Sequence, residues 1–110
     1  MNINIQSLSF QASDRLNDFA KDKINKLSQF SERIMEAQVT LKVDKSDTKN
    51  NMVCEIKLAI PGYDLFASKQ SHSFEEAIIK TTEALKRQLL RWKTKYQKVS
   101  LNQNNMSHES

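Results

Sequence analysis

The segment AQVTLKVD, residues 37–44, alternates apolar and polar side chains more regularly than any other part of the chain. Ala37, Val39, Leu41 and Val43 share one side of the segment, and the residues between them are polar. A period of two is typical of a β-strand with one buried face. We therefore expect a strand here, with its apolar side on a core.

Toward the amino terminus, the sequence predicts a helix preceded by another strand. Ser13 can cap a helix that runs to about Phe30. The opening residues 1–6, MNINIQ, alternate Ile3 and Ile5 with polar residues and predict the first strand. The helix is indicated by apolar residues at helical spacing, which are Leu16, Phe19, Ala20, Ile24, Leu27 and Phe30.

Toward the carboxyl terminus, the sequence predicts a hairpin and a second helix. Residues 45–51, KSDTKNN, are polar and turn the chain into a strand at 52–60. The Pro-Gly pair that follows fits a type II turn, which leads into a strand at 65–71. Ser73 and Glu76 then have the spacing of a capping box. A long amphipathic helix follows and reaches about Tyr96.

The order strand, helix, three strands, helix predicts an α+β fold of βαβββα type. We expect a four-stranded mixed sheet, with strands one and two parallel through a right-handed crossover and both helices packed on one face. A length of 110 residues suits one domain, assigned to residues 1–98. The polar end, residues 99–110, lacks periodicity and is predicted to be disordered.

The composition also bears on location and chemistry. No apolar run approaches the roughly 20 residues of a membrane span, and the amino terminus does not resemble a signal peptide, so we expect a cytoplasmic protein.

His72 precedes the capping serine, and His108 lies in the polar end. Cys54 alternates with apolar residues and is expected to be a buried thiol. These residues offer no metal-ligand spacing, and one glycine in the chain excludes a glycine-rich phosphate loop. We predict no catalytic activity, no metal and no cofactor.

Positive charge is concentrated near the carboxyl terminus. Residues 84–110 carry six basic side chains and one acidic one, whereas residues 1–50 carry eight and seven. Clustered cations attract polyanions. The alternative is a solvated helix face whose cations complement the negative helix end. On a helical projection, the basic residues form one flank of the apolar stripe with Lys80, Arg87, Arg91, Lys95 and Lys98, and another with Lys86 and Lys93.

Several segments together resemble the ribosome hibernation-promoting factor family, which includes the ribosome-associated inhibitor A proteins. KINKLSQFSERI at 23–34 and VTLKVDK at 39–45 resemble the first helix and second strand of that family. FASKQSHSFEEAI at 66–78 and ALKRQLLRWKTK at 84–95 resemble its fourth strand and final helix. The resemblance covers nearly the whole chain from Met1 to about Tyr96.

The resemblance implies which side chains face ribosomal RNA. Two positions depart from the common pattern of the family: Ser73 stands where aspartate is frequent, and Ala84 stands where lysine is frequent. Helix geometry, independently of the resemblance, adds Lys80, Lys86 and Lys98. Basic family positions are matched by Lys23, Lys26, Arg87, Arg91, Lys93 and Lys95.

The implied function is that of a non-catalytic factor that occupies the decoding channel of the small ribosomal subunit and silences translation during stress or stationary phase. The expected partners are that subunit and its ribosomal RNA, with no membrane and no small-molecule substrate. The chain lacks the second domain of long family members, so it is expected to be a short form that is monomeric off the ribosome. The sequence does not indicate whether it promotes ribosome pairing.

Two other functions remain open at this stage. A double-stranded RNA-binding domain shares the order helix, three strands, helix, but usually carries a Gly-Pro-x-His loop and lysines at the start of its second helix. The last helix could also bind an anionic membrane or a protein, which would require its apolar face to be exposed.

Overall fold

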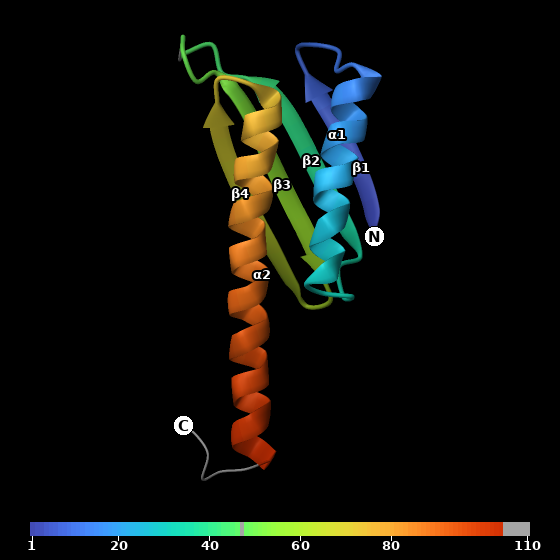
Figure 1. Cartoon of the computed structure of the whole chain (residues 1–110), viewed down its shortest axis with the longest axis vertical. Helices are drawn as coiled ribbons and strands as arrows, with labels where there is room; N and C mark the ends of the chain where they lie inside the picture. The colour runs from blue at the N-terminus through green and yellow to red at the C-terminus, as the bar shows by residue number, and fades with distance from the viewer. Residues whose placement is uncertain (47, 105–110) are drawn as a thin grey trace.

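The computed structural model describes residues 1–46 and 48–104, and it describes side-chain surroundings as far as Trp92. The chain forms one sheet covered by helices (Figure 1). The elements in chain order are β1 (Asn2–Leu8), α1 (Asp14–Asn25), the 3-10 helix η1 (Lys26–Gln29), β2 (Glu36–Val43), β3 (Met52–Ile60), β4 (Tyr63–Ser71) and α2 (Phe74–Asn104).

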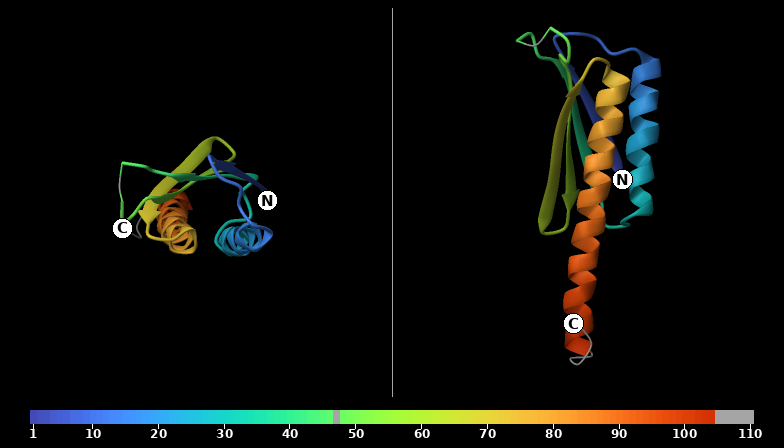
Figure 2. Two further views of the ribbon diagram at one scale, coloured as in Figure 1. Left: turned by 90° about the horizontal axis from the view of Figure 1, so that it is seen from above. Right: turned by 60° about the vertical axis from the view of Figure 1, so that its left-hand side comes forward.

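The four strands lie side by side in the order β1-β2-β3-β4. β1 and β2 are parallel, as expected for strands joined through a crossover helix, and the other two pairings are antiparallel. Val39 of β2 pairs with Ile5 on one side and Ile56 on the other. Both helices cover the same face of the sheet (Figure 2). The predicted βαβββα fold and its mixed sheet are therefore confirmed.

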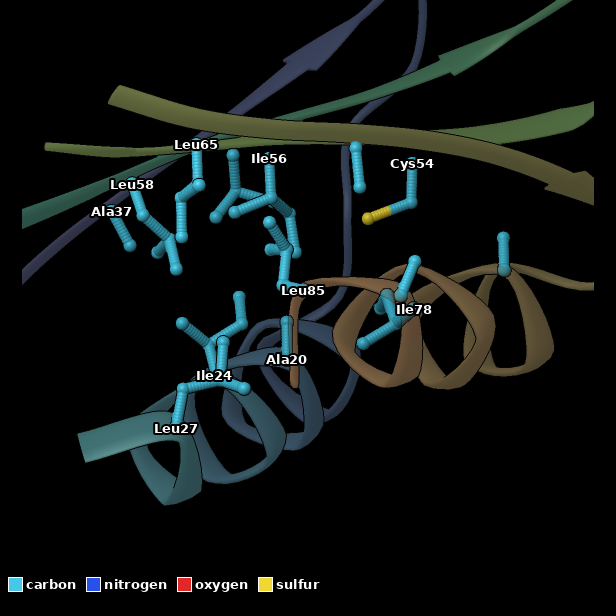
Figure 3. Close-up of a cluster of buried hydrophobic side chains, with 14 of the residues drawn as sticks. Ala20, Ile24, Leu27, Ala37, Cys54, Ile56, Leu58, Leu65, Ile78 and Leu85 are labelled. Atoms are coloured by element: carbon cyan, nitrogen blue, oxygen red, sulfur yellow. The ribbon is translucent and has the colours of Figure 1, made fainter. Parts of the chain in front are cut away.

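The core lies between this face of the sheet and the two helices. Ile24 of α1 and Leu85 of α2 are fully buried and point toward the sheet, where Ile56 and Leu58 are also buried (Figure 3). Burying a side chain of this size contributes about 1.5–3 kcal/mol of hydrophobic free energy. Because α2 packs on β3 and β4 through these buried side chains, they fix its orientation on the sheet.

The helix starts and the hairpin agree with the local sequence signals. Ser13 accepts a hydrogen bond from the Leu16 amide at 3.1 Å, which caps α1. The predicted continuous helix to Phe30 is instead α1 followed by η1. Gly62 has a φ of 77°, the left-handed value required at the third residue of a type II turn. The strand after this turn begins at Tyr63, before the predicted start at Leu65.

The start and the end of α2 differ from the sequence prediction. Ser73 Oγ accepts from the Glu76 amide at 3.1 Å, but the Glu76 carboxylate contacts Ser71 and His72 instead of returning to Ser73, so only half of the capping box forms. The helix continues past Tyr96 to Asn104 and projects beyond the sheet (Figure 1). Its later residues include no glycine or proline that would end a helix. Residues 99–104 are thus helical rather than disordered, and 105–110 lie outside the described residues.

Candidate nucleic-acid interface

The two faces of the molecule differ in charge. The strands turn five charged side chains to the face of the sheet opposite the helices, and acids outnumber bases there three to two. One of these bases, Lys42, is paired with Glu55 at 3.0 Å. Helix α2 carries seven basic and three acidic residues and has no acid after Glu83. The helical face is therefore the side suited to a polyanion.

A groove runs along this face between the first helical segment and α2. It encloses about 290 Å³ and lies open to solvent. Lys23 and Lys26 reach it from α1 and η1, and Lys86 reaches it from α2. The fold thus brings together three predicted site residues that are far apart in the sequence. The remaining lining residues are Leu27, Gln29, Phe30, Ile79, Thr82 and Glu83.

Aromatic rings hold two of these ammonium groups in the groove. The Nζ atom of Lys23 lies 5.5 Å from the centroid of the Phe19 ring, and that of Lys86 lies 5.3 Å from the centroid of Phe30. A cation at this distance from a ring is attracted by the negative charge of the π face. The Lys86 contact joins α2 to the end of η1 across the groove. Lys26 is held differently, by Asp22 at 3.7 Å.

The other flank of α2 presents a second group of cations. Lys80, Arg87 and Arg91 are exposed, and neither arginine forms an ion pair with any residue that the structure describes. Gln88 of this flank donates to the Phe66 carbonyl at 3.0 Å, which places the flank beside β4. Arg87 and Arg91 lie one helical turn apart, about 6 Å along the axis. The structure therefore separates the predicted site into the groove and this β4-side flank.

The remaining predicted residues, Lys93, Lys95 and Lys98, lie in α2 beyond the part whose side chains are described. The structure adds one cation that the sequence prediction missed. Lys69 lies two residues from Ala67 and two from Ser71, both of which are buried, so its side chain points to the same side of β4 as theirs, the helical side. It remains exposed because β4 is an edge strand. The alternation within residues 65–71 could have identified it.

The cysteine and histidine that could take part in catalysis have surroundings typical of structural residues. Burial raises the pKa of the Cys54 thiol to about 12, so the thiolate required of a nucleophile is scarce at neutral pH. His72 faces Ser71 Oγ at 3.4 Å and the Glu76 carboxylate at 2.9 Å with the same ring nitrogen, Nδ1, whereas in a catalytic triad the serine and the carboxylate contact different ring nitrogens. Within the described part of the chain, no group of three or more potential ligands could hold a metal ion. No described helix is long and apolar enough to cross a membrane.

The sequence matches the family described as Sigma 54 modulation protein / S30EA ribosomal protein over residues 3–97. The chain belongs to this family. A ribosome hibernation promoting factor of Salmonella typhimurium is 32% identical over 95 residues, which cover 86% of this chain and 96% of the relative. A ribosome hibernation promotion factor of Deinococcus radiodurans is 29% identical over 90 residues, which cover 80% of this chain. The chain spans about half of that longer relative, 47% of its length.

Solved structures of two related proteins share the fold. The N-terminal domain of Protein Y from Thermus thermophilus has a TM-score of 0.73 and 20% identity, and the match covers 84% of this chain and 99% of that domain. A ribosomal subunit interface protein from Coxiella burnetii has a TM-score of 0.77 and 16% identity, with 86% and 99% covered. The family resemblance predicted from the sequence is therefore confirmed by the family match, and the fold by these structures.

Proposed function

We propose that this protein binds the small ribosomal subunit through its helical face and silences translation by occupying the decoding channel during stress or stationary phase. The observation that carries the proposal is the meeting of Lys23, Lys26 and Lys86 in one groove, beside the exposed Arg87 and Arg91 of the same face. Its relatives are ribosome hibernation promoting factors.

The physical basis is recognition of the RNA backbone. Lysines and arginines on a fixed scaffold bind phosphates, which positions a protein on folded RNA without reading base identity. The cations on both flanks of α2 are held by a helix whose core side is buried through Leu85 and Leu89. A rigid domain with such a surface blocks messenger and transfer RNA by occupying their place. No covalent step is needed, so the protein acts without catalysis.

The partner is accordingly the small subunit with its ribosomal RNA, and the protein acts in the cytoplasm as a monomer when it is off the ribosome. Residues 1–98 form the ribosome-binding domain. In this proposal Lys93, Lys95 and Lys98 extend the basic surface along the projecting part of α2.

The decisive experiment measures competition for the small subunit. Purified small subunits are incubated with increasing protein, and the binding of initiator transfer RNA is followed by filter retention while sucrose-gradient sedimentation reports the bound protein. We expect the two ligands to exclude each other and cell-free translation to slow in parallel. Simultaneous binding without mutual loss would disprove occupation of the decoding channel.

A charge-matched variant separates specific binding from general attraction. Lys23→Glu with Lys86→Glu reverses two groove cations, and Lys45→Glu with Lys57→Glu makes the same change in net charge at two exposed lysines that do not line the groove. We expect only the groove variant to lose competition. Equal loss in both variants would indicate that net charge, not the groove, governs binding.

A further inference from the structure

Two aromatic rings meet at the end of the sheet where α2 leaves it. Tyr63 is the first residue of β4, directly after the turn at Gly62, and Trp92 lies on α2. Their rings are stacked at an interplanar angle of 15°, with the centroids 6.4 Å apart. Nearly parallel rings at this distance form an offset stack. The pair thus joins the start of β4, after the hairpin turn, to the part of α2 around Trp92.

The two rings differ in exposure, and this difference matters for function. Trp92 packs against the hydrophobic core as a partly buried residue. Tyr63 is 50% exposed, although a tyrosine present only to cover the core would bury most of its ring. The tryptophan therefore fixes the tyrosine from one side, and much of the tyrosine surface remains available to a ligand.

Positive charge lies next to this pair. Arg91 precedes Trp92 on α2, is exposed, and makes no ion pair with a described residue. The hydrogen bond from Gln88 to the Phe66 carbonyl shows that this flank of α2 follows β4 toward its first residue, Tyr63. Arg91 and the aromatic pair thus lie near the same end of β4.

An exposed aromatic ring stacked on a second ring, with an exposed arginine nearby, matches the chemistry of a nucleotide in single-stranded RNA. The base stacks on the ring, and the neighbouring phosphate pairs with the arginine. A base within a duplex is stacked on its neighbours and does not offer its face in this way. A flat anionic surface that lacks aromatic groups would bind the arginine but would not stack on the tyrosine ring.

We propose that Tyr63 and Trp92 form a stacking platform for one unpaired base of RNA, with Arg91 holding an adjacent phosphate. This inference rests on the proposed function, because it assumes an RNA partner. It adds that the contacted RNA has at least one unstacked nucleotide at the end of the sheet, beyond the backbone contacts of the groove.

Trp92 is the only tryptophan of the chain, so its fluorescence reports the platform directly. The full chain is titrated with a single-stranded RNA of about ten nucleotides and, separately, with a duplex RNA carrying the same number of phosphates. We expect the single strand to quench the emission and the duplex to bind with little quenching. Equal quenching by both RNAs would overturn the inference.

Variants at Tyr63 test the stacking contribution. Tyr63→Ala should weaken binding of the single strand by at least about fivefold, the low end of one base–aromatic stack, whereas Tyr63→Phe should retain parental binding. Tyr63→Leu keeps an apolar cover over Trp92 without a π face and should behave like Tyr63→Ala even if the smaller residue disturbs folding. Phe66→Ala, which removes an aromatic ring of similar exposure from the opposite face of the sheet, should bind like the parent.

Sedimentation with small subunits distinguishes failure of this inference from failure of the proposed function. A folded Tyr63→Leu protein that binds the single strand as the parent does would refute the platform, whatever its behaviour with ribosomes. If the parent protein sediments with small subunits but the single strand does not quench Trp92, the platform is refuted and the proposed function stands. If the parent protein does not sediment with them, the proposed function is refuted.

Discussion

Reversal of Arg87 and Arg91 to glutamate is the sharpest test of the β4-side flank. Both side chains are exposed on α2, and the buried residues Leu85 and Leu89 hold the other side of the helix on the sheet. Neither arginine has an ion-pair partner among the described residues, so the substitution breaks no salt bridge within that part of the protein. The variant should therefore fold as the parent does.

The expected loss of binding follows from the contacts that are removed. A hydrogen bond to a charged group contributes about 1.5–3 kcal/mol, so two arginine–phosphate contacts contribute at least about 3 kcal/mol. Because about 1.4 kcal/mol corresponds to a tenfold change in affinity, association with small subunits should fall by at least about a hundredfold. Repulsion between the new carboxylates and phosphates adds to this loss.

The assay is co-sedimentation with small subunits at fixed salt, with circular dichroism to verify folding. Lys45→Glu with Lys57→Glu is the control, because both lysines are exposed and lie outside the helices: Lys57 points from β3 to the opposite face of the sheet, and Lys45 lies in the loop after β2. Lys42 is unsuitable since its Nζ atom lies 3.0 Å from Glu55, and its reversal would break that pair. A folded Arg87→Glu, Arg91→Glu protein that sediments like the parent would show that these arginines form only a solvated helix face.

Three further outcomes are expected. Association with small subunits should weaken steeply as salt rises in a titration, because phosphate contacts release condensed counterions; a flat response would contradict contact with RNA. Leu85→Ala should lower the free energy of unfolding by about 2–5 kcal/mol in urea denaturation, because it empties a fully buried site. A hydrogen bond from Ser71, supported by the charge of His72, lowers the pKa of Glu76 below its ordinary value of 4.5. The advantage of the parent over Glu76→Gln in thermal melting should thus be complete above pH 4.5 and shrink as the pH falls through the lowered pKa; a gap that stays constant at lower pH would contradict this.

Local patterns in the sequence were sufficient to predict the fold. The alternation of Val39 and Leu41 defined β2, and the sequence Pro61-Gly62 required a turn that only a few backbone conformations satisfy. These signals come from residues that are close together in the sequence, so they can be recognised without knowing the structure. The predicted end of α2, near Tyr96, lies before the observed end at Asn104 for a related reason. Where a helix does not pack on a core it needs no apolar stripe, so its sequence resembles that of an irregular polar segment.

Contacts between distant segments were beyond the reach of such patterns. The position of Lys86 over Phe30 depends on how α1 and η1 are placed along the axis of α2. Local periodicity in the sequence does not determine this relative position. Likewise, the stacking of Trp92 on Tyr63 was not predicted, because Tyr63 follows the hairpin turn and is far from Trp92 in the sequence. The basic residues were found from the sequence, whereas their division into a groove and a β4-side flank required the packed structure.

This division has a physical consequence for binding. Lysines and arginines lose side-chain entropy when they contact a ligand, and the loss is smaller where the free protein already restrains them. Lys23 and Lys86 contact aromatic rings, while Arg87 and Arg91 make no such contact with a residue whose side chain the structure describes. The groove is thus the more preorganised part of the surface, and preorganised contacts convert more of their interaction energy into affinity. If the protein binds RNA as proposed, the flank, with more conformational freedom, is the part that adapts to the path of the RNA backbone.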